Sequence, residues 1–173
     1  MNTNEQRITL SDYFMGRDRT YQADLTPQVL ANATKTVARA NELLARAAAD
    51  GVSASIDQMT KTHVASGWRP ATVNSRTANA GAKSTHISAR GIDVQDSKDR
   101  ALARWCVMHQ LAMAEVGIWM ECPMWTGGID NADPWCHWQT EPPLSGRRIY
   151  IPSTKPAGDP GFYKRYGLAA LRG

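Results

Sequence analysis

Small and hydrophobic residues recur every three or four positions in the stretch between Thr26-Pro27 and Gly51. This spacing places them on one face of a helix. Thr26 fits the N-cap of that helix, Pro27 its first position and Gly51 its end. The residues of the face are Leu30, Ala33, Val37, Ala40, Leu44 and Ala47. The pattern therefore predicts a long amphipathic helix, and a shorter helical turn capped by Ser11 is expected over residues 10–16.

A second helical pattern follows Asp96-Ser97, two residues that favour the N-cap, and it ends at Gly117. Its hydrophobic stripe consists of Leu102, Trp105, Cys106, His109, Met113 and Val116. We expect one long helix here, with the imidazole of His109 hydrogen-bonded in the core.

Several shorter stretches have the composition of strands. In residues 61–68 the side chains alternate as in a sheet with two different faces, and Arg69-Pro70 end the run. The other strand candidates are residues 91–94, 118–121, 136–140 and 147–151. Residues 71–83 and 124–133 are rich in turn-forming residues and are expected to be loops. Two long helices and four or five short strands predict an α+β fold, with the helices packed against a small, mostly antiparallel sheet.

The composition fits a single globular domain. The chain has 173 residues, of which 42% are hydrophobic and 21% charged, and its mean hydropathy is −0.44. We therefore expect residues 1–173 to form one domain with its own core. No hydrophobic run approaches the ~18–20 residues that span a bilayer, and the N-terminus lacks the hydrophobic segment of a secretory signal. These features predict a soluble protein that neither enters a membrane nor is exported by such a signal. We also expect the protein to be a monomer.

Charge and cysteine content argue against some classes of protein. The net charge of +4 and the pI near 9.1 would suit an anionic partner, but the basic residues are scattered and their longest run is Arg147-Arg148. Without a basic stripe that includes aromatic residues, a nucleic-acid binder is not expected. The three cysteines are odd in number and form no C-x-x-C pair, so we expect reduced thiols rather than a disulfide framework or a cysteine zinc site.

Histidines and carboxylates are spaced as they are in some metal sites. His86 precedes Asp93 by seven residues, and His137 follows Asp133 by four. Two imidazoles and one carboxylate are a ligand set of catalytic zinc, which keeps its fourth position open. Zinc in such a site activates water and polarises a carbonyl group. No histidine is followed by glutamate, so the H-E-x-x-H helix of many zinc peptidases is absent. A zinc hydrolase with this sequence would therefore have to belong to another class.

Three segments resemble, in order, the motifs of one family of zinc peptidases. Residues 84–93 resemble the motif S-x-H-x-x-G-x-A-x-D, residues 64–70 (VASGWRP) the "SGYR" strand, and residues 133–138 (DPWCHW) the "EPWH" segment. The family comprises zinc D-alanyl-D-alanine carboxypeptidases and L-alanyl-D-glutamate endopeptidases, including VanY-type enzymes and many bacteriophage endolysins. The resemblance covers about residues 60–140 and implies the hedgehog/D-Ala-D-Ala-peptidase-like fold of these enzymes.

The resemblance also assigns roles to individual residues. The zinc ligands that it implies are His86, Asp93 and His137. Arg69 falls on the arginine that holds the substrate carbonyl and stabilises developing oxyanion charge. Asp133 matches the acid that takes a proton from water and returns it to the leaving amine. Ser84 matches a serine near the metal that has a supporting or substrate-binding role.

The chain departs from the family pattern at two places. Ala89 stands where glycine is usual and Gly91 where alanine is usual, an exchange that we expect to be sterically tolerated. Asp133 precedes His137 by four residues, whereas the family commonly has three. One inserted residue turns a side chain to the opposite face of a regular strand, so a bulge or turn at Pro134 is needed to aim Asp133 at the site. The alternative bases are Asp130 and Glu121.

The resemblance implies a zinc-dependent peptidase that hydrolyses peptidoglycan stem peptides, of the L-alanyl-D-glutamate endopeptidase or D,D-carboxypeptidase type. Its partner is then peptidoglycan. The lack of a secretory signal fits a phage endolysin made in the host cytoplasm and released to the wall, or a lytic enzyme carried in the virion. The alternative, favoured by the irregular spacing at Asp133, is a non-catalytic zinc-binding module with a structural or wall-recognition role in a phage particle.

Overall fold

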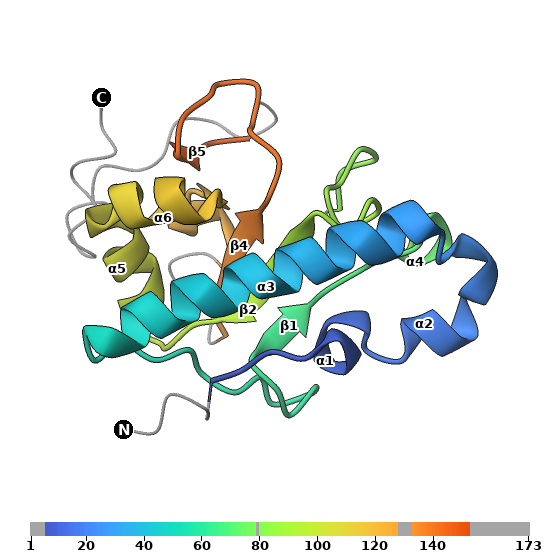
Figure 1. Cartoon of the computed structure of the whole chain (residues 1–173), viewed down its shortest axis with the longest axis horizontal. Helices are drawn as coiled ribbons and strands as arrows, with labels where there is room; N and C mark the ends of the chain where they lie inside the picture. The colour runs from blue at the N-terminus through green and yellow to red at the C-terminus, as the bar shows by residue number, and fades with distance from the viewer. Residues whose placement is uncertain (1–5, 79, 128–132, 153–173) are drawn as a thin grey trace.

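The fold is built around one five-stranded sheet, and its strands lie between the helices in Figure 1. The computed structural model describes residues 6–78, 80–127 and 133–152. The strands are β1 (Val64–Ser66), β2 (Gly91–Gln95), β3 (Trp119–Glu121), β4 (Trp135–Gln139) and β5 (Ile149–Tyr150). They lie in the order β1-β2-β4-β3-β5, and every neighbouring pair is antiparallel except β3 and β5, which are parallel. The predicted α+β class with a small, mostly antiparallel sheet is confirmed.

The longest helix, α3 (Pro27–Ala49), crosses the sheet on one side, and α5 (Ala101–Met108) and α6 (Gln110–Val116) lie beside its C-terminal half (Figure 1). The hydroxyl of Thr26 accepts a backbone hydrogen bond in the first turn of α3, and Pro27 is its first residue, as predicted. The remaining helical segments are α1 (Leu10–Phe14), α2 (Arg17–Thr20), α4 (Ala71–Asn74), and the 3-10 turns η1 (Gln22–Asp24) and η2 (Pro123–Trp125).

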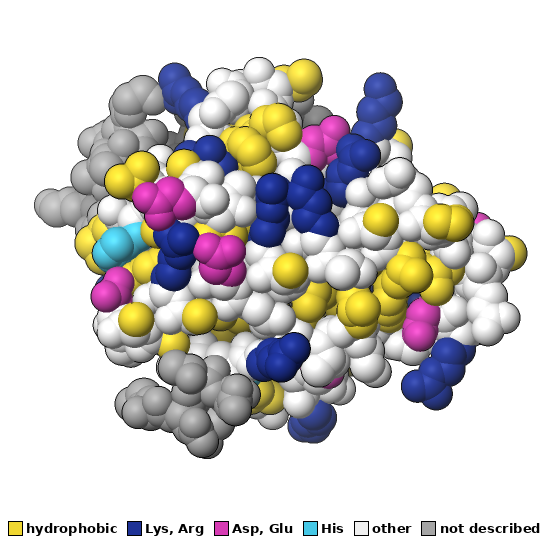
Figure 2. All heavy atoms as spheres, viewed as in Figure 1, with side chains coloured by type: hydrophobic (Ala, Val, Ile, Leu, Met, Phe, Trp, Pro, Cys, Tyr) yellow, Lys and Arg dark blue, Asp and Glu magenta, His cyan; other side chains and the backbone are white. Residues whose placement is uncertain are grey.

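The surface carries mixed charge. On the face drawn in Figure 2, several lysine and arginine side chains gather across the upper middle, and the others are interspersed with acidic, polar and hydrophobic ones. Among the described residues, no helix has both the length and the hydrophobicity needed to cross a bilayer.

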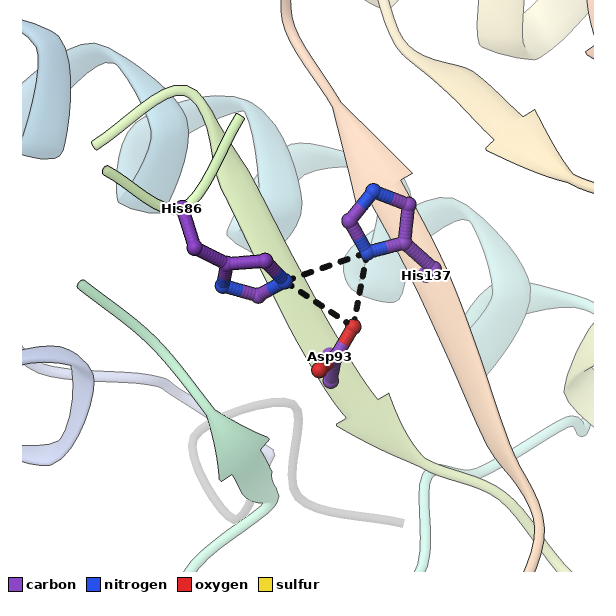
Figure 3. A group of neighbouring side chains, drawn as sticks. All are labelled: His86, Asp93 and His137. Carbon is purple, nitrogen blue, oxygen red and sulfur yellow. Dashed lines mark hydrogen bonds and ion pairs between the residues drawn. The ribbon is translucent and has the colours of Figure 1, made fainter. Parts of the chain in front are cut away.

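The two faces of the sheet carry different side chains. Ile92 and Val94 of β2 and Trp138 of β4 belong to the hydrophobic core. Because side chains alternate along a strand, Asp93 and His137 point to the opposite face. Figure 3 shows them there, with helices behind the strands. One face of the sheet is thus covered by the core, and the other carries polar groups.

Some details of the helices and loops differ from the prediction. The second long helix is divided into α5 and α6, because His109 leaves the helical conformation and its Nδ1 binds the carbonyl oxygen of Trp105. Its ring stacks on Trp105 and its side chain is 41% exposed, so the predicted core position is wrong. Thr9, not Ser11, caps α1, because it forms a reciprocal capping box. Residues 71–83 contain α4.

Two elements begin later than their sequence patterns suggest. The carboxylate of Asp96 accepts hydrogen bonds from N–H groups in the first turn of α5, as predicted for a cap. The helix nevertheless starts only at Ala101, because Arg100 adopts a left-handed conformation with φ of 57°. Strand β1 starts at Val64 rather than at position 61, because the carboxylate of Asp57 closes a turn just before it.

Candidate metal site

Three side chains that are far apart in the sequence meet on the polar face of the sheet (Figure 3). Nε2 of His86 lies 3.3 Å from Oδ1 of Asp93 and 3.2 Å from Nδ1 of His137. Nδ1 of His137 lies 2.7 Å from the same carboxylate oxygen. All three side chains are buried or nearly so. The residues that the motifs single out therefore form one group that can hold a metal ion.

Strand pairing positions two of the three side chains. Strands β2 and β4 pair over five successive positions without a register shift, and Asp93 and His137 are direct partners at the middle position. Side chains of directly opposed residues lie on the same face, with Cβ atoms about 4.5–5.5 Å apart. The register that buries the hydrophobic residues of both strands therefore also brings this carboxylate to this imidazole.

His86 comes from the loop before β2, and a second contact orients its ring. Its Nδ1 lies 2.7 Å from the carbonyl oxygen of Gly67. Because a carbonyl oxygen only accepts hydrogen bonds, Nδ1 carries the hydrogen and Nε2 presents its lone pair toward Asp93 and His137. The hydroxyl of Ser84 accepts a hydrogen bond from the N–H of His86 at 3.3 Å and so braces the loop. The tautomer that a metal ligand needs is thus fixed by the surrounding chain.

The distances within this group fit a small tetrahedral ion. Zinc binds nitrogen and oxygen ligands at ~2.0–2.1 Å, so the ligand atoms of a tetrahedral site lie about 3.3 Å apart. Two of the three distances between the candidate ligand atoms, 3.2 and 3.3 Å, match this value, and the third, 2.7 Å between His137 and Asp93, is shorter. Imidazole nitrogen and carboxylate oxygen are also donors that zinc prefers. Three ligands leave one of four tetrahedral positions for water or substrate.

Burial and neighbouring charges set the protonation of the group. Burial lowers the pKa of His86, although Asp93 opposes this effect. Burial would raise the pKa of Asp93, but the neighbouring imidazoles of His86 and His137 outweigh this effect and hold that pKa far below its ordinary range. Burial also lowers the pKa of His137, but the hydrogen bond and charge of Asp93, followed by the charge of Glu121, raise it overall. An ionised carboxylate and a neutral His86 are the forms that metal ligands need.

Arg69 lies at the edge of this group. Its Nη2 is 3.8 Å from Oδ2 of Asp93, and the residue is only 9% exposed. Within the part of the chain that the structure describes, its Nε makes no hydrogen bond. Burial lowers the pKa of the guanidinium, and the charge of Asp93 partly restores it. Arg69 is therefore a nearly buried cation beside the candidate ligands, a position suited to a carbonyl oxygen or an oxyanion.

The exchange of alanine and glycine before Asp93 has a structural basis. Ala89 has a φ of 57°, a left-handed conformation that glycine adopts more easily. A Cβ atom on Gly91 would lie 2.4 Å from Oγ1 of Thr85 and 3.2 Å from Cε1 of His137. Oγ1 of Thr85 is itself 3.4 Å from Nε2 of His137. Gly91 thus leaves room for the hydroxyl of Thr85 beside Nε2 of His137. Ala89, in contrast, is held in a backbone conformation that is unfavourable for alanine.

The variant Gly91→Ala should weaken zinc binding by about tenfold, because the added methyl group would displace Thr85 and the ring of His137. Competition with a chelating dye measures the affinity. Gly81→Ala is the matched control, since a Cβ atom there meets nothing within 4 Å. Equal zinc affinities for the two variants would contradict the expected steric coupling between Gly91 and the ligand group.

The three candidate bases occupy different places. Asp133 lies in an exposed bend before β4, and its Oδ1 accepts a hydrogen bond from Nε2 of Gln95 at 2.6 Å. Strand β4 pairs regularly with β2 along its whole length, so no bulge lies within the strand that leads to His137. Glu121 is the last residue of β3, and its charge acts on His137. Asp130 lies outside the described residues.

No sequence pattern indicated that Tyr150 and Gln139 belong to this region. The hydroxyl of Tyr150 donates to Oε1 of Gln139 at 2.6 Å, and Gln139 follows His137 by two residues on the same face of β4. Burial, then the charges of Glu121 and Asp93, raise the pKa of Tyr150 above its ordinary value. Because β5 pairs with β3 rather than with β4, its predecessor in the sequence, no local sequence pattern could have placed Tyr150 here.

Comparisons with known proteins identified no relative. A scan of family models, a search of curated proteins and a search of solved structures each found no match to this chain. The interpretation of the site therefore rests on the three motifs and on the geometry of the side chains that they bring together.

Proposed function

We propose that the chain is a zinc-dependent peptidase that hydrolyses peptide bonds in the stem peptides of bacterial peptidoglycan. The proposal is carried by the triangle of Nε2 of His86, Oδ1 of Asp93 and Nδ1 of His137, with edges of 2.7, 3.2 and 3.3 Å. The segments that supply and surround these atoms resemble zinc D-alanyl-D-alanine carboxypeptidases and L-alanyl-D-glutamate endopeptidases. Three motifs in the same order are a more specific signal than any one of them.

In this proposal His86, Asp93 and His137 hold one zinc ion, which when bound activates water and polarises the scissile carbonyl group. Arg69 binds the carbonyl oxygen and stabilises the negative charge that develops on it. A carboxylate accepts a proton from the attacking water and delivers it to the leaving nitrogen. The family resemblance gives this last role to Asp133.

Peptidoglycan is the proposed partner of a monomeric enzyme. As an endopeptidase made in the host cytoplasm, the protein would act as a phage endolysin that reaches the wall after release, or as a lytic component of the virion. The formal charge of +4 would add a weak attraction to an anionic wall.

Zinc-loaded protein should clear a suspension of permeabilised Gram-negative cells and release new amino groups from purified sacculi. A chelator should stop both effects because the three ligands then lack the ion, and added zinc should restore them. Turbidity and amine labelling measure the two effects. Protein that carries one zinc ion per chain but releases no amine from sacculi would contradict the proposed activity.

A non-catalytic zinc-binding module of a phage particle is the second candidate. It is favoured by Asp133, which stands four residues before His137 and directs Oδ1 to Gln95. Such a module would bind zinc and sediment with sacculi, yet would release no amine at any zinc concentration. Co-sedimentation measured together with amine release distinguishes the two candidates.

A further inference from the structure

We propose that Glu121 of β3, in place of Asp133, is the carboxylate that carries the proton during hydrolysis. The inference rests on the proposed peptidase function and specifies one residue of its mechanism. It follows from where the pairing of β3 with β4 places Glu121 relative to the candidate ligand His137.

The register of the sheet sets Glu121 opposite His137. The pairing of β3 with β4 ends with Met120 opposite Trp138, and one further step in the same register sets Glu121 opposite His137. Opposed Cα atoms in such a ladder lie about 4.5–5.5 Å apart. Met120 and Trp138 point into the core. Because side chains alternate, Glu121 points to the other face, where His137 meets the other candidate ligands.

The groups around Glu121 support a position inside the site. Glu121 pairs with Tyr150 in the parallel ladder of β3 and β5. Burial raises the pKa of Tyr150 most, and the charge of Glu121 comes second. The hydrogen bond and charge of Asp93 raise the pKa of His137 most, and the charge of Glu121 comes next. Glu121 is half-buried, so its side chain is partly shielded from water.

Asp133 is placed less well for this role. It stands four residues before His137, in the bend that precedes β4 and outside the regular pairing of β4 with β2. Its Oδ1 accepts a hydrogen bond of 2.6 Å from Gln95, which follows Asp93 by two residues in β2. One oxygen of the Asp133 carboxylate is thus held by a side chain of β2 that is not one of the candidate ligands.

The proton transfers balance without a further reactant. One O–H bond of water breaks as its proton passes to the carboxylate of Glu121, and the water oxygen bonds to the carbonyl carbon. The C–N bond then breaks, and the same proton passes from Glu121 to the leaving nitrogen. The products are a carboxylic acid and an amine, and Glu121 returns to its starting ionisation. Arg69, whose Nη2 lies 3.8 Å from Oδ2 of Asp93, would stabilise the developing oxyanion.

The variant Glu121→Gln should keep one zinc ion per chain and a KM near that of the wild type, while kcat on a stem peptide falls by about 10²–10⁴-fold. Glu121→Asp, which keeps a shortened carboxylate, should retain more turnover than Glu121→Gln. Glu115→Gln is the matched control, because Glu115 is an exposed glutamate of α6 paired with Arg46. The decrease in kcat caused by Asp133→Asn should be smaller than that caused by Glu121→Gln by a factor of about ten or more.

Binding of a phosphinate analogue of the stem dipeptide gives a readout that does not depend on turnover. Glu121→Ala should weaken its binding to the zinc-loaded protein by about 10- to 100-fold, because a hydrogen bond to a charged group is lost. Glu115→Ala should bind the analogue as the wild type does. Isothermal titration measures both affinities.

The outcomes separate this inference from the function on which it rests. A zinc-loaded wild type without turnover would overturn both. If the wild type is active and Glu121→Gln is equally active, the role of Glu121 is overturned and the peptidase function stands. The same holds if Asp133→Asn lowers kcat more than Glu121→Gln does. Unchanged binding of the phosphinate by Glu121→Ala would also overturn that role.

Discussion

Replacing His137 with alanine should remove zinc binding and, with it, hydrolysis. Nδ1 of His137 is one of the three candidate ligand atoms, and it also binds the carboxylate of Asp93 at 2.7 Å. Loss of a group that merely orients a ligand weakens metal binding by about 10- to 100-fold, so loss of a ligand should cost on the order of 100-fold or more. Competition titration and the zinc content after dialysis measure this loss.

His109→Ala is the control for His137→Ala. The imidazole of His109 stacks on Trp105 where α5 meets α6, so its removal takes nothing from the ligand group. Zinc affinity should stay at the wild-type value. A folded His137→Ala protein that binds one zinc ion as tightly as His109→Ala would place the metal elsewhere in the molecule.

Gly67→Ala should lower the free energy of unfolding of the zinc-free protein by about 3 kcal/mol. A Cβ atom at this position would lie 1.8 Å from the carbonyl oxygen of Tyr13, a backbone atom that cannot rotate away. Helix α1 cannot shift easily either, because Tyr13 is fully buried and its hydroxyl donates to the carbonyl oxygen of Gly91 at 2.9 Å. Urea denaturation measures the change.

The same substitution should also weaken zinc binding, because the carbonyl oxygen of Gly67 orients His86. Gly81→Ala, which adds its methyl group to open space, should change the stability by less than about 1 kcal/mol. Equal unfolding free energies for Gly67→Ala and Gly81→Ala would contradict the close approach of β1 to α1.

The sequence predicted the parts of the fold whose signals are local. Thr26, Pro27 and the helical spacing after them suffice to define α3, because a cap and an apolar stripe act within one helix. The break at His109 was not predictable from spacing, because the hydrophobic stripe continues across it. The break depends on the contact between the imidazole of His109 and the carbonyl oxygen of Trp105.

The candidate site shows the same division. His86, Asp93 and His137 were found from their motifs, and the structure brings them together because β2 and β4 pair in register. The position of Glu121 beside His137 depends on a second pairing, that of β3 with β4. Such a pairing joins segments with no sequence signal for one another, so the sequence alone could offer Glu121 only as an alternative base.

Mass spectrometry of the muropeptides released from purified sacculi tests the central claim most directly. The proposed peptidase should, when loaded with zinc, give products that have gained one water per cleaved bond. A new amino terminus within the stem would define an endopeptidase, and loss of the terminal D-alanine a carboxypeptidase. The chelated protein and His137→Ala should leave the muropeptides unchanged. Unchanged muropeptides after treatment with protein that holds one zinc ion at His86, Asp93 and His137 would contradict a peptidase acting on the cell wall.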